Sequence, residues 1–243
     1  MDILRPSLVR IGLKRGDLIF DRGEPLNRVL FPLASVISIV LDMSDGSTAE
    51  VGLIGREGMT GLSLALGQAR ANQRAVVQVP NGAECLDVGD FAAAVQAEPE
   101  LKAFVLRYAQ ATLMVTAQIS ACSSLHPTNE RCARWLLMAH DRVDSDLILL
   151  TQEFLSQMLG VRRGSVTLAA SALQEAGFIS YSRGHITIRN RSGLESASCE
   201  CYETIERDWK NIMGYSARKE SSPFGSAQVP AFSGDGSTQE HTP

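Results

Sequence analysis

The segment from Thr151 to Gly177 constrains the fold of this chain most, because it holds two short amphipathic patterns with a very short connection between them. Thr151 can cap a first helix, whose apolar face continues until Gly160 ends it. The second pattern repeats valine, alanine and leucine at three- and four-residue steps and stops at Gly177. Two helices joined by a tight, glycine-containing turn predict a helix-turn-helix.

Strand-like runs flank these two helices. Residues 147–150 precede the first helix, and residues 178–182 and 185–189 alternate around Arg183-Gly184 after the second. Alternation on both sides of such a dipeptide predicts a β-hairpin with the dipeptide at its tip. The unit is therefore expected to be a winged helix-turn-helix.

The expected outward face of the second helix carries residues that suit double-stranded DNA. If Val166, Ala169 and Leu173 face inward, then Ala176 does too, and Arg163 lies outside among small side chains. Small residues let a helix enter the major groove, and the arginine fork matches guanine O6 and N7. The residues expected to contact DNA are Thr151, Gln152, Arg162, Arg163, Gly164, Ser165, Thr167, Leu168, Ser171 and Arg183.

The charge distribution favours the same partner. The formal net charge is −4, but residues 159–191 hold five arginines and one glutamate and so carry +4, which leaves −8 for the rest. No apolar run reaches the roughly 18 residues that span a bilayer. The first residues carry charges and no apolar core of a secretory signal, so we expect a cytoplasmic protein without a membrane partner.

The chain before residue 98 predicts an all-β domain. Between Leu13 and Val88, short apolar runs alternate with glycine-containing turns, which is typical of a small antiparallel sandwich or roll. Asp45-Gly46 is expected to be a tight two-residue hairpin turn. The clearest strands are residues 36–41, 50–54 and 75–79.

Helices are expected after the β-domain. Asp90 can cap a short helix, Pro99 opens a long one that ends near Leu125, and residues 129–141 form another. The apolar stripe of the long helix can pack on its own chain or pair with a second copy in a dimer, and we favour the dimer. The stripe comprises Phe104, Tyr108, Ala111, Val115, Gln118, Cys122 and Leu125.

Residues 13–214 resemble the Crp/Fnr-type transcription regulators. In the first half the resemblance is carried by Gly16-Asp17, Phe20, Gly23-Glu24, Asp45-Gly46, Gly58 and Gly61. In the second half it is carried by Arg131, Arg134, Trp135-Leu136-Leu137, the run from Leu150 to Leu155, and Gly160-Val161-Arg162-Arg163. It implies an α+β protein with three parts: an antiparallel cyclic-nucleotide-binding-like β-roll of the double-stranded β-helix or jelly-roll type (1–97), a dimerisation helix (98–125) and a winged helix-turn-helix (126–214). After Gly214 the sequence is rich in serine, glycine and proline and has few large apolar residues, which predicts a disordered tail (215–243).

The resemblance also implies a function. A bacterial regulator of this type binds a pseudo-palindromic DNA site as a homodimer, and contacts RNA polymerase if it is an activator. Cyclic-AMP-dependent members present an arginine, a glutamate and a second arginine on the recognition helix. Arg163 fills the first of these places, but Gly164 and Leu168 fill the others, so the half-site must differ. Gly164 fits either close approach of the backbone to DNA or fraying of the helix start.

The effector pocket of the family holds a cyclic phosphate with an arginine and a ribose hydroxyl with a glutamate. Alignment on residues 58–61 places Leu62 at the glutamate and Gln73 at the arginine, with Arg74 one residue late. A one-residue shift turns a strand side chain to the opposite face, so Arg74 is expected on the surface or beside an acidic residue. We therefore expect an effector other than cyclic AMP, or none. The candidate pocket residues are Gly61, Leu62, Ser63, Gln73 and Arg74.

The five cysteines are scattered and odd in number, so we expect free thiols. No cysteine precedes Cys85 and no histidine precedes His126, which disfavours an iron–sulfur or haem sensor in the roll. Cys199 with Cys201, or Cys122 with Cys132, could bind a metal or respond to oxidation. Four ligands are not evident in either set, so we expect structural thiols, no metal and no cofactor.

The sequence gives weaker support to two other classes of function. A small-molecule sensor that acts through protein contacts would use the basic wing to bind an acidic partner protein. An enzyme is disfavoured because the sequence lacks a glycine-rich phosphate loop, a nucleophile elbow and a convergent set of histidine, aspartate and serine.

Overall fold

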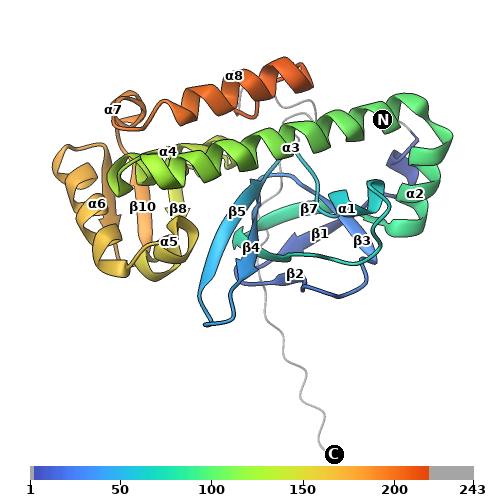
Figure 1. Cartoon of the computed structure of the whole chain (residues 1–243), viewed down its shortest axis with the longest axis horizontal. Coiled ribbons are helices and arrows are strands. Elements are labelled where there is room, and N and C mark those ends of the chain that lie inside the picture. Colours follow the sequence, from blue (N-terminus) through green and yellow to red (C-terminus); the bar gives the residue numbers. More distant parts are fainter. Residues whose placement is uncertain (1–2, 219–243) are drawn as a thin grey trace, which may run out of the picture.

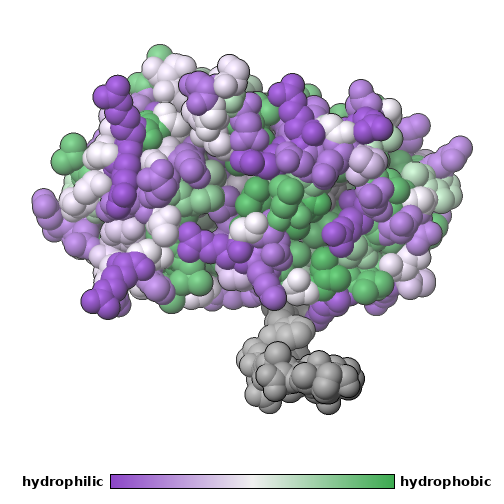
Figure 2. All heavy atoms as spheres, turned by 90° about the horizontal axis from the view of Figure 1, so that it is seen from below, coloured by the Kyte–Doolittle hydropathy of each residue, from purple (hydrophilic) through white to green (hydrophobic). Residues whose placement is uncertain are grey.

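The computed structural model describes residues 3–218. A β-roll and a helical domain with a small sheet lie at opposite ends of one side of a long helix, α3, and helix α8 lies along its other side (Figure 1). Hydrophilic side chains dominate the face in Figure 2, with hydrophobic ones gathered near its middle. Within the described part of the chain, no helix is long and apolar enough to cross a membrane. The predicted α+β class is confirmed.

The roll consists of two antiparallel sheets. One has the strand order β1-β7-β3 and the other β2-β6-β4-β5. Alternating apolar side chains, among them Leu30, Ile37 and Val77, fill the space between the sheets. The strands are β1 (Val9–Leu13), β2 (Leu18–Phe20), β3 (Arg28–Pro32), β4 (Val36–Asp42), β5 (Thr48–Ile54), β6 (Arg74–Val79) and β7 (Asn81–Asp87); the short helices η1 (Arg5–Ser7) and α1 (Leu62–Ala65) accompany them.

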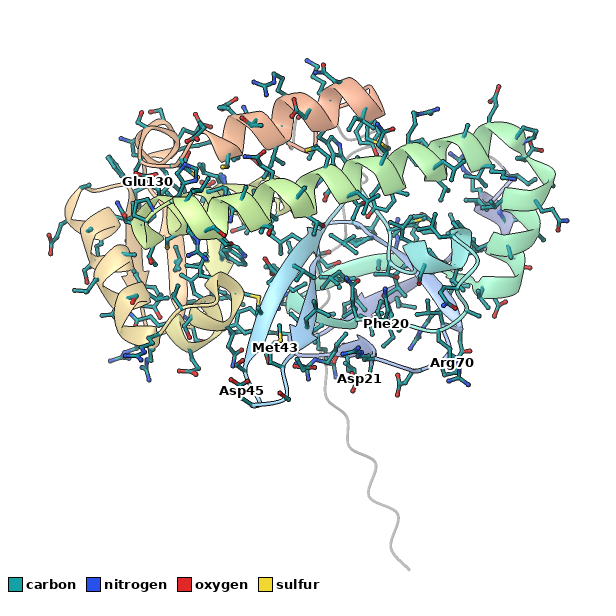
Figure 3. The ribbon with its side chains drawn as sticks, viewed as in Figure 1. Phe20, Asp21, Met43, Asp45, Arg70 and Glu130 are labelled. Carbon is teal, nitrogen blue, oxygen red and sulfur yellow. The ribbon has the colours of Figure 1, made fainter. Side chains whose placement is uncertain are left out.

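The β4–β5 hairpin is confirmed, but the two-residue turn expected at Asp45-Gly46 is wrong. The Met43 N–H donates to the Ser47 carbonyl at 2.8 Å, so a wider loop joins the strands. Gly46 takes a φ of +84°, whereas the Asp45 carboxylate accepts from the Ser47 N–H at 2.9 Å. Aspartate thus stabilises the loop through its side chain instead of a left-handed backbone. Met43 and Asp45 lie at the hairpin tip in Figure 3.

The two longer central helices follow the predicted boundaries closely, whereas the short helix before them was expected at residues 91–96 and begins earlier. Helix α2 (Val88–Ala97) is capped by Asp87, which accepts from the Gly89 N–H at 2.7 Å, and not by Asp90 as expected. Asp90 lies in the first turn instead. Helix α3 (Pro99–Leu125) and helix α4 (Thr128–Arg142) are separated by the break at His126-Pro127.

The C-terminal domain is a three-stranded sheet packed against short helices. Its sheet order is β8-β10-β9, and the α6 side chains Val166, Ala169 and Leu173 are buried against α4 and α5. Ala176, which was expected to face inward, is exposed because α6 ends one residue before it. The elements are β8 (Leu147–Leu149), α5 (Gln152–Leu159), α6 (Arg163–Glu175), β9 (Ile179–Ser182), β10 (His185–Ile188), α7 (Arg191–Ser196) and α8 (Cys201–Met213).

Helix α8 covers α3 along the side that faces away from the roll (Figure 1). Trp209 of α8 meets Tyr108 of α3 edge to face, with ring centroids 5.9 Å apart. After α8, Tyr215 stacks on Phe104 at 6.4 Å, and its hydroxyl donates to the Glu57 carbonyl at 2.9 Å. Residues 215–218 are therefore packed, although the sequence analysis placed them in the tail. Residues 219–243 of the expected tail lie outside the described residues.

Candidate DNA-binding site

The helix-turn-helix has the local geometry that its sequence predicts. The Thr151 hydroxyl accepts from the Phe154 N–H at 3.2 Å and so caps α5. Gly160 ends α5 with a φ of +61°, and Gly177 follows α6 with a φ of +74°. Both values lie in the left-handed region, where glycine has no Cβ penalty. The two glycines therefore fix the lengths of the two helices.

The outer face of α6 is exposed and small. Arg163, Gly164, Thr167, Leu168 and Ser171 are all exposed, and Leu168 is 74% accessible. Val166, Ala169 and Leu173 on the opposite face are buried. The division between the two faces at these eight positions agrees with the sequence analysis. It leaves a narrow helix edge on which arginine is the one long side chain.

The start of α6 is open to an anion. Its first turn has no acidic residue and no side-chain cap, so its N–H groups lack side-chain partners. Arg162 and Arg163 stand beside it and are exposed, while Ser165 is half-buried. Among residues 3–218, neither arginine forms an ion pair. Both guanidinium groups are free to pair with an incoming anion.

Gln152 and Thr167 hold the two helices together. The Thr167 hydroxyl donates to the Gln152 side-chain carbonyl at 3.0 Å, which links α6 to the first turn of α5. The Gln152 N–H donates to the Tyr181 hydroxyl at 3.1 Å. These two expected contact residues thus also take part in hydrogen bonds that join α5 to α6 and to β9.

The wing tip lies close to the start of α5. Arg183 has a φ of +47° and Gly184 a φ of +81°, which is the geometry of a tight hairpin turn. The Leu150 N–H donates to the Gly184 carbonyl at 2.8 Å and anchors the tip. The Arg183 side chain is exposed beyond this anchor. The wing therefore adds Arg183 to Arg162 and Arg163 near the helix-turn-helix.

One of the five arginines counted in this region has a different role. The Arg191 Nη2 lies 2.6 Å from the Asp141 Oδ1, and its Nε lies 2.9 Å from Glu195. Arg191 also donates to the Tyr202 hydroxyl at 2.5 Å. Its charge is neutralised within the domain, so the positive surface depends on the remaining arginines.

A cavity of about 290 Å³ lies between the roll and α3. Four of the candidate effector residues, Gly61, Leu62, Ser63 and Gln73, line it. Arg74 does not; its Nη2 pairs with the Asp42 Oδ1 at 2.7 Å. Arg74 thus pairs with an acidic neighbour, as the sequence analysis expected for a side chain on the opposite face of the strand.

The walls of the cavity are mainly apolar. Phe20 and Ile39 of the roll, Leu113 of α3 and Trp209 of α8 all contribute. Phe20 lies beneath α3 in Figure 3. Of the described lining residues, Arg142 alone is charged, and its guanidinium is already paired with Glu57 at 2.8 Å. The cavity therefore offers no unpaired cation for a phosphate among these residues.

The stripe that was assigned to a dimer is covered within one chain. Tyr108, Ala111, Val115 and Cys122 are buried, and Gln118 is half-buried and donates to Cys201. These residues therefore pack against their own chain, which is the alternative that the sequence analysis left open. Leu125, at the end of the predicted stripe, is 77% accessible. A different face of α3 also stays exposed, with Leu106 49% and Leu113 71% accessible.

The described chain thus joins a β-roll, a long helix and a winged helix-turn-helix, in that order. Residues 130–197 match the family model of the Crp-like helix-turn-helix domain. No curated protein sequence matches the chain.

Solved structures of regulators share the fold. FixK2 from Bradyrhizobium japonicum is 15% identical with a TM-score of 0.65, over 79% of this chain and 98% of that one. A CRP-family transcriptional regulator from Thermus thermophilus is 17% identical with a TM-score of 0.64, over 77% and 96%. The c-di-GMP-responsive global regulator CLP from Xanthomonas campestris is 13% identical with a TM-score of 0.58, over 77% and 96%. With the domain match, these likenesses confirm the resemblance to Crp/Fnr-type transcription regulators.

Proposed function

We propose that this protein is a sequence-specific DNA-binding transcription regulator that acts as a homodimer on a pseudo-palindromic site. The observation that carries the proposal is the exposed edge of α6, where Arg163 stands among small residues at an uncapped helix start. Such an edge fits the major groove, and the arginine can read a guanine. The match of residues 130–197 to the Crp-like helix-turn-helix domain supports this use of the edge.

The homodimer rests on the uncovered face of α3. Leu106 and Leu113 are seven residues apart, and Gln110, Ala117 and Ser124 continue the same face at heptad spacing. All five are exposed within one chain. A partner helix would bury the two leucines, and the small residues would let the helices approach closely. A dimer would bring two copies of α6 to one duplex.

Selection of DNA fragments with the full-length protein tests the proposal. We expect enrichment of an inverted repeat, and an affinity that falls steeply as salt rises because phosphate contacts release counterions. Enrichment of no sequence, or binding that is indifferent to salt, would refute the DNA-binding function. Saturable capture of an acidic protein without DNA binding would favour the sensor that acts through protein contacts.

The cavity beneath α3 is proposed to accept an uncharged, mainly apolar effector. Its described walls provide no unpaired cation, and Leu62 and Gln73, which line it, occupy the places that the resemblance assigns to a glutamate and an arginine. A buried phosphate without a paired cation is costly, so cyclic AMP and c-di-GMP should not bind there. Calorimetry of the wild type with each nucleotide at micromolar concentration checks this, and a saturable isotherm would refute it.

A further inference from the structure

Four potential metal ligands from distant parts of the sequence meet at the end of α3. Cys122 lies one turn before His126, which ends the helix, and Cys199 and Cys201 lie at the start of α8. Each of the four offers a ligand atom, and these atoms all lie within 4.8 Å of one another. The three thiols are buried and the imidazole is half-buried. Glu130, labelled in Figure 3, marks the first turn of α4 that follows this junction.

Two of the six separations between these ligand atoms match those around a single tetrahedral ion. The Sγ atoms of Cys122 and Cys199 are 3.5 Å apart, and the Cys201 Sγ is 3.6 Å from the His126 Nδ1. Zinc bonds of about 2.3 Å to sulfur and about 2.1 Å to nitrogen place tetrahedral ligand atoms roughly 3.5–3.8 Å apart. In an iron–sulfur cluster the four protein ligands do not all bind the same iron atom, so some of them must stand wider apart. The spacing therefore favours a mononuclear site.

The groups around these ligands are those that a metal site needs. The His126 Nε2 lies 3.1 Å from the Glu200 Oε1, so the Nδ1 faces the thiols. A carboxylate on the far nitrogen fixes the ring and raises its basicity as a ligand. The Gln118 amide donates to the Cys201 Sγ at 3.1 Å, which is a hydrogen bond that holds this sulfur in place. The sulfur and imidazole ligands and the side chains that orient them are thus all present.

We propose that Cys122, His126, Cys199 and Cys201 form a structural Zn²⁺ site that fastens the start of α8 to the end of α3. Four protein ligands leave no open coordination position, which is the property of a structural site. The ion replaces the thiol protons, which pass to solvent. It would stabilise the contact by which α8 covers α3, including the packing of Trp209 on Tyr108. The other two cysteines lie outside the cluster, since Cys132 belongs to the main core and Cys85 to the roll.

Metal analysis of the full-length protein tests the site. We expect about one Zn²⁺ per chain in the wild type, as four ligands for one ion require. Cys122→Ser and Cys199→Ser should each lose most of the metal, whereas Cys85→Ser, a cysteine variant outside the cluster, should retain it. A wild type that binds no Zn²⁺, or a Cys122→Ser/Cys199→Ser double variant with full metal content, would overturn the proposal.

Two further measurements test the site even if a cysteine variant fails to fold. Co²⁺ added to the metal-free wild type should give the visible absorption of a tetrahedral ion together with sulfur-to-metal charge transfer. Glu200→Gln, which keeps all four ligands, should weaken Zn²⁺ binding by roughly 10- to 100-fold in competition with a chelator. An octahedral Co²⁺ spectrum, or mass spectrometry that finds a Cys122–Cys199 disulfide in place of metal, would overturn the site.

Discussion

The carboxylate of Glu57 and the guanidinium of Arg142 form a buried ion pair that joins the roll to the end of α4. Their Oε1 and Nε atoms are 2.8 Å apart, and the side chains are 3% and 5% exposed. Burial acts to lower the pKa of Arg142, but Glu57 and Asp141 outweigh it and raise that pKa. A Cβ at Gly55 would lie 2.5 Å from the Arg142 Cγ, so glycine leaves the room that the pair requires.

Glu57→Gln should destabilise the protein by about 3–5 kcal/mol, because it leaves the Arg142 charge buried without its partner. Asp144→Asn is the matched control: it breaks the pair of Asp144 with Arg56, in which Asp144 is 65% exposed, and should cost at most about 1 kcal/mol. Urea unfolding of both variants measures the difference. Equal effects of the two changes would contradict a special role for the buried pair.

Arg163→Ala should lose about 1–3 kcal/mol of DNA-binding free energy, concentrated at one base position of each half-site. The reason is that its exposed guanidinium can pair with a single guanine. Arg183→Ala at the wing tip is the comparison, and it should weaken binding evenly across sequences and reduce the salt slope by about one. Affinities for a panel of single-base variants check both. An even loss for Arg163→Ala would make it a phosphate contact.

Gly164→Ala should raise stability and lower DNA affinity. A Cβ at this position meets no atom within 4 Å, and alanine favours a helix by up to about 1 kcal/mol over glycine. If the α6 backbone lies against DNA, the added methyl group enters that contact and should weaken binding by roughly tenfold, about 1.4 kcal/mol. Thermal unfolding measures the change in stability, and DNA titration measures the change in affinity. Unchanged DNA affinity would mean that the glycine reflects only the frayed start of the helix.

Leu113→Arg should convert a dimer into a monomer, because it places a charge in the middle of the uncovered α3 face, where Leu113 is 71% exposed in one chain. Leu18→Arg in strand β2 removes a similarly exposed leucine, 50% accessible, away from α3 and should leave the dimer intact. Analytical ultracentrifugation of the two variants distinguishes these outcomes. A wild type that is monomeric at micromolar concentration would contradict the dimer.

Glu50 should make the stability of the protein depend on pH. Burial raises the pKa of Glu50 to about 7, although hydrogen bonds from Ser38 and Trp135 oppose the shift. The folded state therefore binds more protons than the unfolded state between pH 4.5 and about 7, and the free energy of unfolding falls as pH rises through that range.

Glu50→Gln cannot ionise, and it keeps a carbonyl for the Trp135 N–H. It should flatten this part of the stability profile and gain roughly 1–3 kcal/mol over the wild type at pH 8. Urea unfolding at several pH values measures both curves. Parallel curves for the two proteins would show that Glu50 does not titrate in this range.

Several features of the fold followed from local sequence. The boundaries of α3, the Thr151 cap, the glycines at 160 and 177 and the two faces of α6 could be predicted because they depend on periodicity and on the φ of single residues. The same holds for the wing, since its tip dipeptide determines the hairpin. These features are determined by residues that are close together in the sequence.

Other features were decided by tertiary structure. An apolar stripe shows that a helix face will be covered but does not show which element covers it. The sequence analysis assigned the α3 stripe to a second copy of the chain, whereas in the structure it packs mainly against α8 of its own chain. The spacing of Cys122 and His126 and the Cys199-Glu200-Cys201 run were visible in the sequence. Their convergence was not, because more than 70 residues separate the two pairs and only the packing of α8 on α3 brings them together.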